Sequence, residues 1–211
     1  MSAALLREGS FYLVKTRLAG KTLGILGLGR IGAAVAKIAP AFQMPVIAWS
    51  ENLTAEAATE RGARRVEKDE LFARSDILSV HQLLSPRSRG LVGQRELSLM
   101  RPDAWLVNTS RGPIIDNDAL ARALASGKVW GAGLDVFETE PLPADSPLRG
   151  FDNVILTPHV AANSEESVQD LYRTGCNVVL DVLHGRWPPS VVNPEAMDAA
   201  AFRLNAGGKI P

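Results

Sequence analysis

The sequence predicts an α/β protein of the doubly wound, Rossmann type, with helices on both faces of a parallel sheet. Short apolar runs alternate with segments of helical spacing along most of the chain, which is the order that strand–helix–strand units require. Glycines with the spacing GxGxxG stand at Gly27 to Gly32, between a strand-like run and an alanine-rich helical pattern. That context is the one in which this spacing binds a dinucleotide.

The glycine loop is a candidate pyrophosphate site. Gly27 would permit the tight turn out of the strand, Gly29 would let the backbone approach the ligand, and Gly32 would let the helix pack against the strand. The N–H groups and dipole of the helix N-terminus favour negative charge, and Arg30 and Ile31 stand beside them as further cofactor-binding candidates. A glycine-rich turn without a ligand is the alternative, and the flanking strand and helix favour the nucleotide site.

The elements around this loop follow from apolar spacing. Thr22 to Leu26 is strand-like, and Ile31, Val35 and Ile38 recur at helical spacing. Val46 to Trp49 is short and continuously apolar, as buried parallel strands are. These segments form the first strand–helix–strand unit.

The residues after the second strand bear on the choice of cofactor. Dinucleotide sites usually place Asp or Glu here to accept hydrogen bonds from the adenosine ribose. This chain has Ser50, which could bond a ribose hydroxyl weakly, followed by Glu51. Glu51 could take the carboxylate role and would repel a 2′-phosphate, which favours NAD over NADP. The alternative is that Glu51 is a solvated turn residue.

The alternation of strands and helices continues to the last third of the chain. Asp116 is a candidate N-cap for a helix that buries Leu120 and Leu124 and ends at Gly127 in a left-handed conformation. Further helices are predicted at Thr54 to Arg61, Lys68 to Arg74 and Gln94 to Met100, and further strands at Ile77 to Val80, Ala104 to Val107, Val129 to Leu134 and Val154 to Thr157.

A long helix is predicted after the last strand. Asn163 with Glu166 three positions later resembles a capping box, and the helix should end near Gly185. Cys176 stands among its apolar residues and is expected to be a buried small hydrophobe. His184 beside the terminal glycine is expected to interact with the helix dipole rather than to act in catalysis.

Three segments are predicted along the chain. Residues 1–20 are a leader or linker, with a short helix at Ser2 to Arg7 and an extended piece at Phe11 to Val14. Residues 21–185 form the dinucleotide-binding domain, and residues 186–211 form an extended C-terminal tail.

Composition excludes several classes of function. Lys and Arg number 23, as do Asp and Glu, and no basic run exceeds two residues, so no nucleic-acid partner is expected. The single cysteine excludes an internal disulfide and a cysteine-based zinc site, and no metal is expected. No apolar run reaches membrane-spanning length and no export signal is present, so we expect a cytoplasmic protein without membrane association.

Polar residues cluster at the carboxyl ends of the predicted strands, where doubly wound sheets bind ligands. They are His81, Arg111, Asp135 and His159, with Glu140 in a following loop. Reduction of a 2-keto acid by a nicotinamide needs a cation for the carboxylate and a proton donor for the carbonyl oxygen. Arg111 could hold the carboxylate bidentately, and His159 could supply the proton with Glu140 favouring its charged form.

Four motifs together resemble the NAD-dependent D-2-hydroxyacid dehydrogenases, over about Lys21 to Gly185. They are GLGRIG at Gly27 to Gly32, NTSRG at Asn108 to Gly112, LDVFETEP at Leu134 to Pro141 and TPH at Thr157 to His159. The resemblance implies NAD as cofactor, a small 2-keto or 2-hydroxy acid as substrate and a homodimer.

The same resemblance assigns roles to individual residues. Arg111 would bind the substrate carboxylate, His159 would be the acid/base and Glu140 its partner. Asp135 would contact the nicotinamide carboxamide, and Thr109 would line the cofactor site.

The sequence also departs from the family pattern. Family members build a substrate domain mainly from residues before the nucleotide domain, and here about twenty residues precede it, which implies that this domain is missing or truncated. Ser50 replaces the family acid, and Leu83 stands where a proline is expected after the strand that ends at His81. His81 itself either lines the pocket or is a hydrogen-bonded strand terminus. The alternative function is a non-enzymatic NAD(H)-binding regulatory module or an inactive truncated dehydrogenase.

Overall fold

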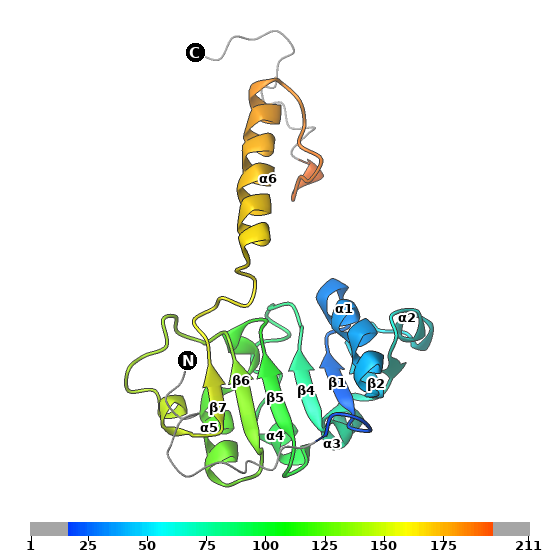
Figure 1. The fold of residues 1–211 in the computed structure, drawn as a ribbon, viewed down its shortest axis with the longest axis vertical. Coiled ribbons are helices and arrows are strands. Elements are labelled where there is room, and N and C mark those ends of the chain that lie inside the picture. Colours follow the sequence, from blue (N-terminus) through cyan, green and yellow to red (C-terminus); the bar gives the residue numbers. More distant parts are fainter. Residues whose placement is uncertain (1–16, 196–211) are drawn as a thin grey trace. The chain divides into compact units, whose positions relative to one another are not determined.

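The computed structural model describes residues 17–195 (Figure 1). These residues fall into two compact units, of which the first ends at Ala161 and the second begins at Ala162. The helix predicted at Ser2 to Arg7 and the extended piece at Phe11 to Val14 lie outside the described residues, as do residues 196–211 of the predicted tail. The predicted segment boundaries at residues 20 and 185 stay predictions.

The first unit is built on a seven-stranded, entirely parallel sheet of order β3-β2-β1-β4-β5-β6-β7. The predicted doubly wound fold is therefore confirmed. The chain leaves β1 toward β2 and later returns to place β4 on the other side of β1, so the strand order reverses between β1 and β4, the point at which doubly wound sheets bind ligands. The strands are β1 (Leu23–Leu26), β2 (Val46–Trp49), β3 (Arg64–Arg65), β4 (Ile77–Val80), β5 (Trp105–Asn108), β6 (Gly131–Leu134) and β7 (Val154–Leu156).

Helices cover both faces of the sheet. Because side chains alternate along a strand, Ile25 joins a core with residues of α1 and α2, whereas Leu26 joins a second core with residues of α3, α4 and α5. These helices are α1 (Arg30–Ile38), α2 (Ala55–Glu60), α3 (Lys68–Arg74), α4 (Gln94–Leu99) and α5 (Asn117–Ala125), joined by the 3₁₀ turns η2 (Ala39–Phe42), η3 (Gly112–Ile114) and η4 (Pro147–Gly150). The 3₁₀ turns and the short strand β3 were not predicted, because neither has a repeating apolar pattern.

Helix α1 packs on the sheet through its small residues. Gly32 and Ala36 are buried, and a Cβ atom at Gly32 would collide with the carbonyl oxygen of Gly27. Ile31 and Ile38, whose recurrence predicted the helix, are instead 69% and 59% exposed. The apolar recurrence located the helix, whereas the close approach of helix to strand selects which side faces the core.

Helix α5 has the predicted ends. The side chain of Asp116 accepts a hydrogen bond from the N–H of Ala119 at 2.9 Å, and Gly127 has a φ of +69°. Leu120 and Leu124 are buried in the core. The N-cap, the left-handed glycine and the buried side of this helix are therefore confirmed.

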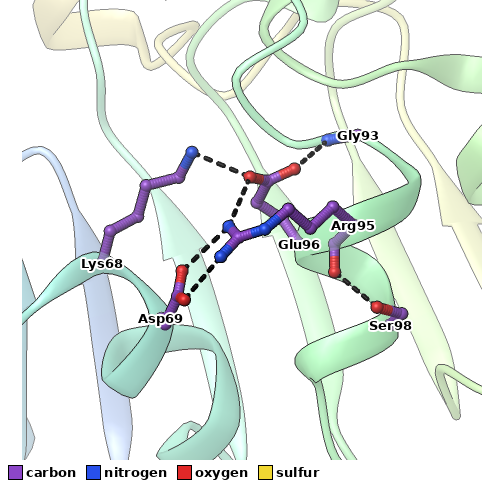
Figure 2. Close-up of polar contacts among 6 residues, drawn as sticks. All are labelled: Lys68, Asp69, Gly93, Arg95, Glu96 and Ser98. Atoms are coloured by element: carbon purple, nitrogen blue, oxygen red, sulfur yellow. Dashed lines mark hydrogen bonds and ion pairs between the residues drawn. The ribbon is translucent and has the colours of Figure 1, made fainter.

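A charged network joins α3 to α4 (Figure 2). Lys68 Nζ lies 2.8 Å from Glu96 Oε1, and the N–H of Gly93 donates to Glu96 Oε2 at 3.2 Å. Arg95 adds a bidentate pair with Asp69, with N to O distances of 2.9 and 2.6 Å. Burial raises the pKa of Glu96, but the bonds from Lys68 and from backbone N–H groups outweigh it and hold that pKa below its ordinary value.

The second unit contains helix α6 (Glu165–Leu183). Its capping box is formed by Ser164 and Ser167 and not by the predicted Asn163 and Glu166: Ser164 Oγ accepts the N–H of Ser167 at 3.1 Å, and Ser167 Oγ accepts the N–H of Ser164 at 2.9 Å. The predicted box lies one residue too early in the chain. The hydroxyls of Ser164 and Ser167 accept the N–H groups of each other's residues, which satisfies both donors of the box.

The far end of α6 matches the prediction, but its cysteine does not. His184 caps the helix, its Nδ1 lies 2.7 Å from the carbonyl oxygen of Leu180, and Gly185 follows with a φ of +70°. Cys176 is exposed, so the expectation of burial was wrong; none of the residues of α6 is buried. Within residues 17–195, no helix combines the length and apolar character needed to cross a membrane.

Candidate active site

The glycine loop leaves room for a ligand beside the N-terminus of α1. Gly27 has a φ of +98°, and a Cβ atom there would collide with the backbone of His81 and Gln82. Gly29, the N-cap of α1, faces open space and no side chain caps the helix. The loop therefore packs tightly on the residues after β4 at Gly27 and leaves space at Gly29, where a pyrophosphate would approach. These residues fit a dinucleotide.

Side chains from two other elements fix the middle of this loop. Ser50 Oγ accepts the N–H of Leu28 at 2.9 Å, and Arg61 Nη1 donates to the carbonyl oxygen of Leu28 at 2.7 Å. Neither contact with the glycine loop was predicted, and the expected bond from Ser50 to a ribose hydroxyl stays a prediction. Arg30 and Glu51, which are neighbours in the sequence of Gly29 and Ser50, are exposed to solvent.

The loop after β5 presents Arg111 through a buried asparagine. Asn108 is 1% exposed; its Nδ2 donates to the carbonyl oxygen of Arg111 at 3.0 Å, and its Oδ1 accepts the N–H of Ser110 at 3.0 Å. Ser110 Oγ donates to the carbonyl oxygen of Gln82 at 2.6 Å, which ties this loop to the end of β4. Thr109 and the side chain of Arg111 are exposed.

Gly112 brings the loop after β5 against the loop after β6. A Cβ atom at Gly112 would collide with the backbone of Phe137 and Glu138, so only glycine permits this approach. The approach places the charge of Arg111 close enough to help lower the pKa of Glu140. The loop that carries Arg111 is therefore in backbone contact with the loop that carries Glu140.

His159 and Glu140 form a hydrogen-bonded pair. His159 Nδ1 lies 2.8 Å from Glu140 Oε2, while Glu140 Oε1 accepts the N–H of Phe137 at 2.9 Å. The bonds from His159 and Phe137, together with the positive charges, hold the pKa of Glu140 below its ordinary value. An ionised carboxylate on Nδ1 leaves Nε2 of the imidazole as the nitrogen that can exchange a proton with a substrate.

The backbone at His159 is held in an unusual conformation. Its φ is +55°, a region that non-glycine residues rarely adopt and that is found at functional sites. A cavity of about 460 Å³ opens beside His159 and Glu140, with Phe137, Leu142 and Arg149 in its wall. Its volume is in the range of small-molecule sites, about 300–1,000 Å³.

Asp135 anchors the turn that carries His159. It is 3% exposed, its Oδ1 accepts the hydroxyl of Thr157 at 2.6 Å and the N–H of Val160 at 2.9 Å, and its Oδ2 accepts the N–H of Ala161 at 2.9 Å. Burial raises the pKa of Asp135, but these hydrogen bonds outweigh it and hold the pKa below its ordinary value. Asp135 therefore positions His159, a role that the sequence did not predict.

His81 directly follows β4, is half-buried and has a hydrogen-bond partner within that strand. Its Nε2 lies 2.9 Å from Ser79 Oγ, and burial lowers the pKa of its imidazole. This supports the expectation of a hydrogen-bonded strand terminus. Leu83, in place of the family proline, is 80% exposed.

The residues predicted to act in catalysis thus lie in loops at the carboxyl ends of the strands. Sequence reasoning missed the residues that position them: Asn108, Ser110, Gly112, the N–H of Phe137, and Thr157. All five lie within the four family motifs, but the motifs were assigned roles toward ligands and not toward the backbone. Within residues 17–195, no group of three His, Cys, Asp or Glu side chains is placed to hold a metal ion.

The family follows from comparison with known proteins. A family model described as the D-isomer specific 2-hydroxyacid dehydrogenase, NAD binding domain, matches residues 2–161. The chain belongs to this family. The expected resemblance is therefore confirmed, and with it the Rossmann-type NAD-binding domain.

Two relatives of this D-2-hydroxyacid dehydrogenase domain show the range of the family. The glyoxylate reductase of Aeropyrum pernix is 43% identical over 185 residues, which cover 88% of this chain and 55% of that protein. The D-3-phosphoglycerate dehydrogenase of Methanocaldococcus jannaschii is 42% identical over 177 residues, which cover 83% of this chain and 34% of that protein. The chain spans about half the length, or less, of these curated relatives.

A solved structure supports the same placement. The NAD-complexed D-isomer specific 2-hydroxyacid dehydrogenase of Lactobacillus delbrueckii ssp. bulgaricus superposes with a TM-score of 0.77 at 30% identity. The match covers 85% of this chain and 58% of that one. The dehydrogenase domain described here therefore has a relative of known structure that binds NAD.

Proposed function

We propose that this chain transfers a hydride between NAD(H) and C2 of a small D-2-hydroxy acid or 2-keto acid. The observation that carries the proposal is the His159–Glu140 pair, with the loop of Arg111 packed on the loop of Glu140, at the carboxyl ends of the same parallel strands as the glycine loop. These groups supply the acid/base and the cation that 2-keto acid reduction needs.

The residues that would hold the cofactor are those of the glycine loop and its neighbours. These residues lie at the carboxyl ends of the strands. The cofactor, when bound, would supply or take up the hydride. Glu51 favours NAD over NADP because its charge repels a 2′-phosphate. The proposed set is Gly27, Gly29, Arg30, Ile31, Gly32, Ser50, Glu51, Thr109 and Asp135.

Arg111 and His159 would act on the substrate. The guanidinium of Arg111 matches a carboxylate in shape and charge, so it would orient the 2-keto acid. Protonated His159 would donate from Nε2 to the carbonyl oxygen as C2 is reduced, and Glu140 on Nδ1 would hold the ring in orientation for the transfer. In the oxidation direction, His159 would take the proton from the hydroxyl.

The second candidate is a non-enzymatic NAD(H)-binding module or an inactive truncated dehydrogenase. It is favoured by one observation: the open N-terminus of α1 at the glycine loop can hold a dinucleotide whether or not a substrate is turned over. Turnover additionally requires closure over the substrate, which excludes water and completes the site. A homodimer and a cytoplasmic location belong to the first proposal.

One experiment separates these candidates. NADH is titrated into the purified chain by fluorescence, and its oxidation is then followed with glyoxylate, hydroxypyruvate and pyruvate. The dehydrogenase proposal predicts binding and turnover with at least one acid. Binding without turnover would reject the enzyme and retain the binding module, whereas no binding would reject both.

A further inference from the structure

The central residue of the glycine loop is held from both sides by groups that bear on cofactor choice. Leu28 is 1% exposed. Its N–H is bound by Ser50, directly after β2, and its carbonyl oxygen is bound by Arg61, directly after α2. The hydroxyl and the guanidinium therefore flank a single residue of the loop.

Ser50 occupies the position of the ribose-binding acid without its charge. Its oxygen accepts a hydrogen bond from Leu28, so its own hydrogen can still be donated to a ribose hydroxyl or to a phosphate oxygen. A carboxylate at this point would repel a 2′-phosphate, and a hydroxyl does not. Ser50 thus discriminates little between the two cofactors.

Arg61 adds a positive charge at the carbonyl side of the same residue, Leu28. Its side chain uses Nη1 toward Leu28, and a guanidinium carries five N–H donors in all. Arg61 is exposed, so the remaining donors are accessible from solvent. An arginine near the ribose end of a dinucleotide site is the group that accommodates a 2′-phosphate.

We infer that Arg61 is a determinant of cofactor choice that opposes Glu51 and lets this site accept NADP(H) as well as NAD(H). The inference rests on the proposed function, because it requires that the glycine loop bind a dinucleotide. It goes beyond that proposal by assigning a residue of α2's C-terminal end to the 2′ position. The preference that Glu51 gives for NAD is then small.

The test is binding and needs no turnover. NADH and NADPH are titrated by nicotinamide fluorescence into the wild type, Arg61→Met and Arg61→Lys. Arg64→Met is the matched control, since Arg64 is also exposed but pairs with Glu70. Melting temperatures establish that each variant is folded.

The wild type should bind NADPH within about tenfold of NADH, and Arg61→Met should weaken NADPH about tenfold or more beyond any loss that it causes in NADH affinity. Arg61→Lys should retain most of the NADPH affinity because it keeps the charge, and Arg64→Met should change neither. NADH binding with NADPH more than about tenfold weaker in the wild type, or an equal loss of both in Arg61→Met, overturns the inference alone. Absence of both cofactors in every folded variant overturns the proposed function with it.

Discussion

His159 Nδ1 lies 2.8 Å from Glu140 Oε2, and the second oxygen of the same carboxylate is fixed 2.9 Å from the N–H of Phe137. One oxygen of the carboxylate is therefore fixed by the backbone of its own loop, while the other orients the imidazole. The pair joins two loops, one after β6 and one after β7, at the edge of the sheet where the ligand is expected.

Replacing Glu140 should impair proton transfer more than cofactor binding. In Glu140→Gln the bond between a carboxylate and His159 Nδ1 is lost, so turnover should fall about 10- to 100-fold, corresponding to a charge-assisted bond of about 1.5–3 kcal/mol. NADH affinity should be unchanged. Steady-state turnover and fluorescence titration check the two halves, with Glu138→Gln, an exposed neighbour, as control. Equal turnover in both variants would remove Glu140 from the acid/base pair.

Asp135 should contribute to stability through the turn that contains His159. Asp135→Asn replaces a carboxylate that accepts three hydrogen bonds with an amide that offers one acceptor oxygen. We expect a loss of about 1–3 kcal/mol in the free energy of unfolding. Denaturant unfolding measures it, and the exposed Asp152→Asn should leave stability unchanged. A stable Asp135→Asn variant would contradict the anchoring role.

The contact between Gly112 and Phe137 should tolerate no side chain. Gly112→Ala would force the two loops apart, and we expect a loss of stability of about 1–3 kcal/mol together with weaker substrate binding, because Arg111 moves away from Glu140. Gly150→Ala is the control, since nothing lies near a Cβ atom there. Unfolding curves that coincide for both variants would show that the loops are not in backbone contact.

Much of the fold could be predicted from the spacing of apolar residues. Most of the residues that position the site through hydrogen bonds and close packing could not. The α-helices of the first unit, and its strands other than β3, were predicted because apolar residues recur with strand or helix spacing. The exposure of Ile31 and Ile38 was not, because it depends on how closely α1 approaches Gly27 across the loop. Likewise Arg111, Glu140 and His159 were recognisable by chemistry and motif, whereas Asn108 acts through bonds that exist only in the folded loop.

Acid should weaken the junction between α3 and α4. The pKa of Glu96 is lowered in the folded state, so its ionised form contributes stability that is complete above the ordinary value of about 4.3 and is lost as pH falls through the lowered pKa. Glu96→Gln should be less stable than wild type by about 1–3 kcal/mol at neutral pH, and the difference should shrink below about pH 4.3. Unfolding at several pH values tests this, with the exposed Glu60→Gln as control. A difference independent of pH would contradict the assignment.

The most direct test of the account is a comparison of His159→Gln with His184→Gln. Both are exposed histidines that bond a nearby oxygen, but only His159 is paired with Glu140. NADH oxidation in the presence of the preferred 2-keto acid should fall about 100-fold or more in His159→Gln, as for loss of a general acid, with NADH affinity unchanged. His184→Gln should keep wild-type turnover. Wild-type turnover in His159→Gln would contradict the proposed role of the His159–Glu140 pair.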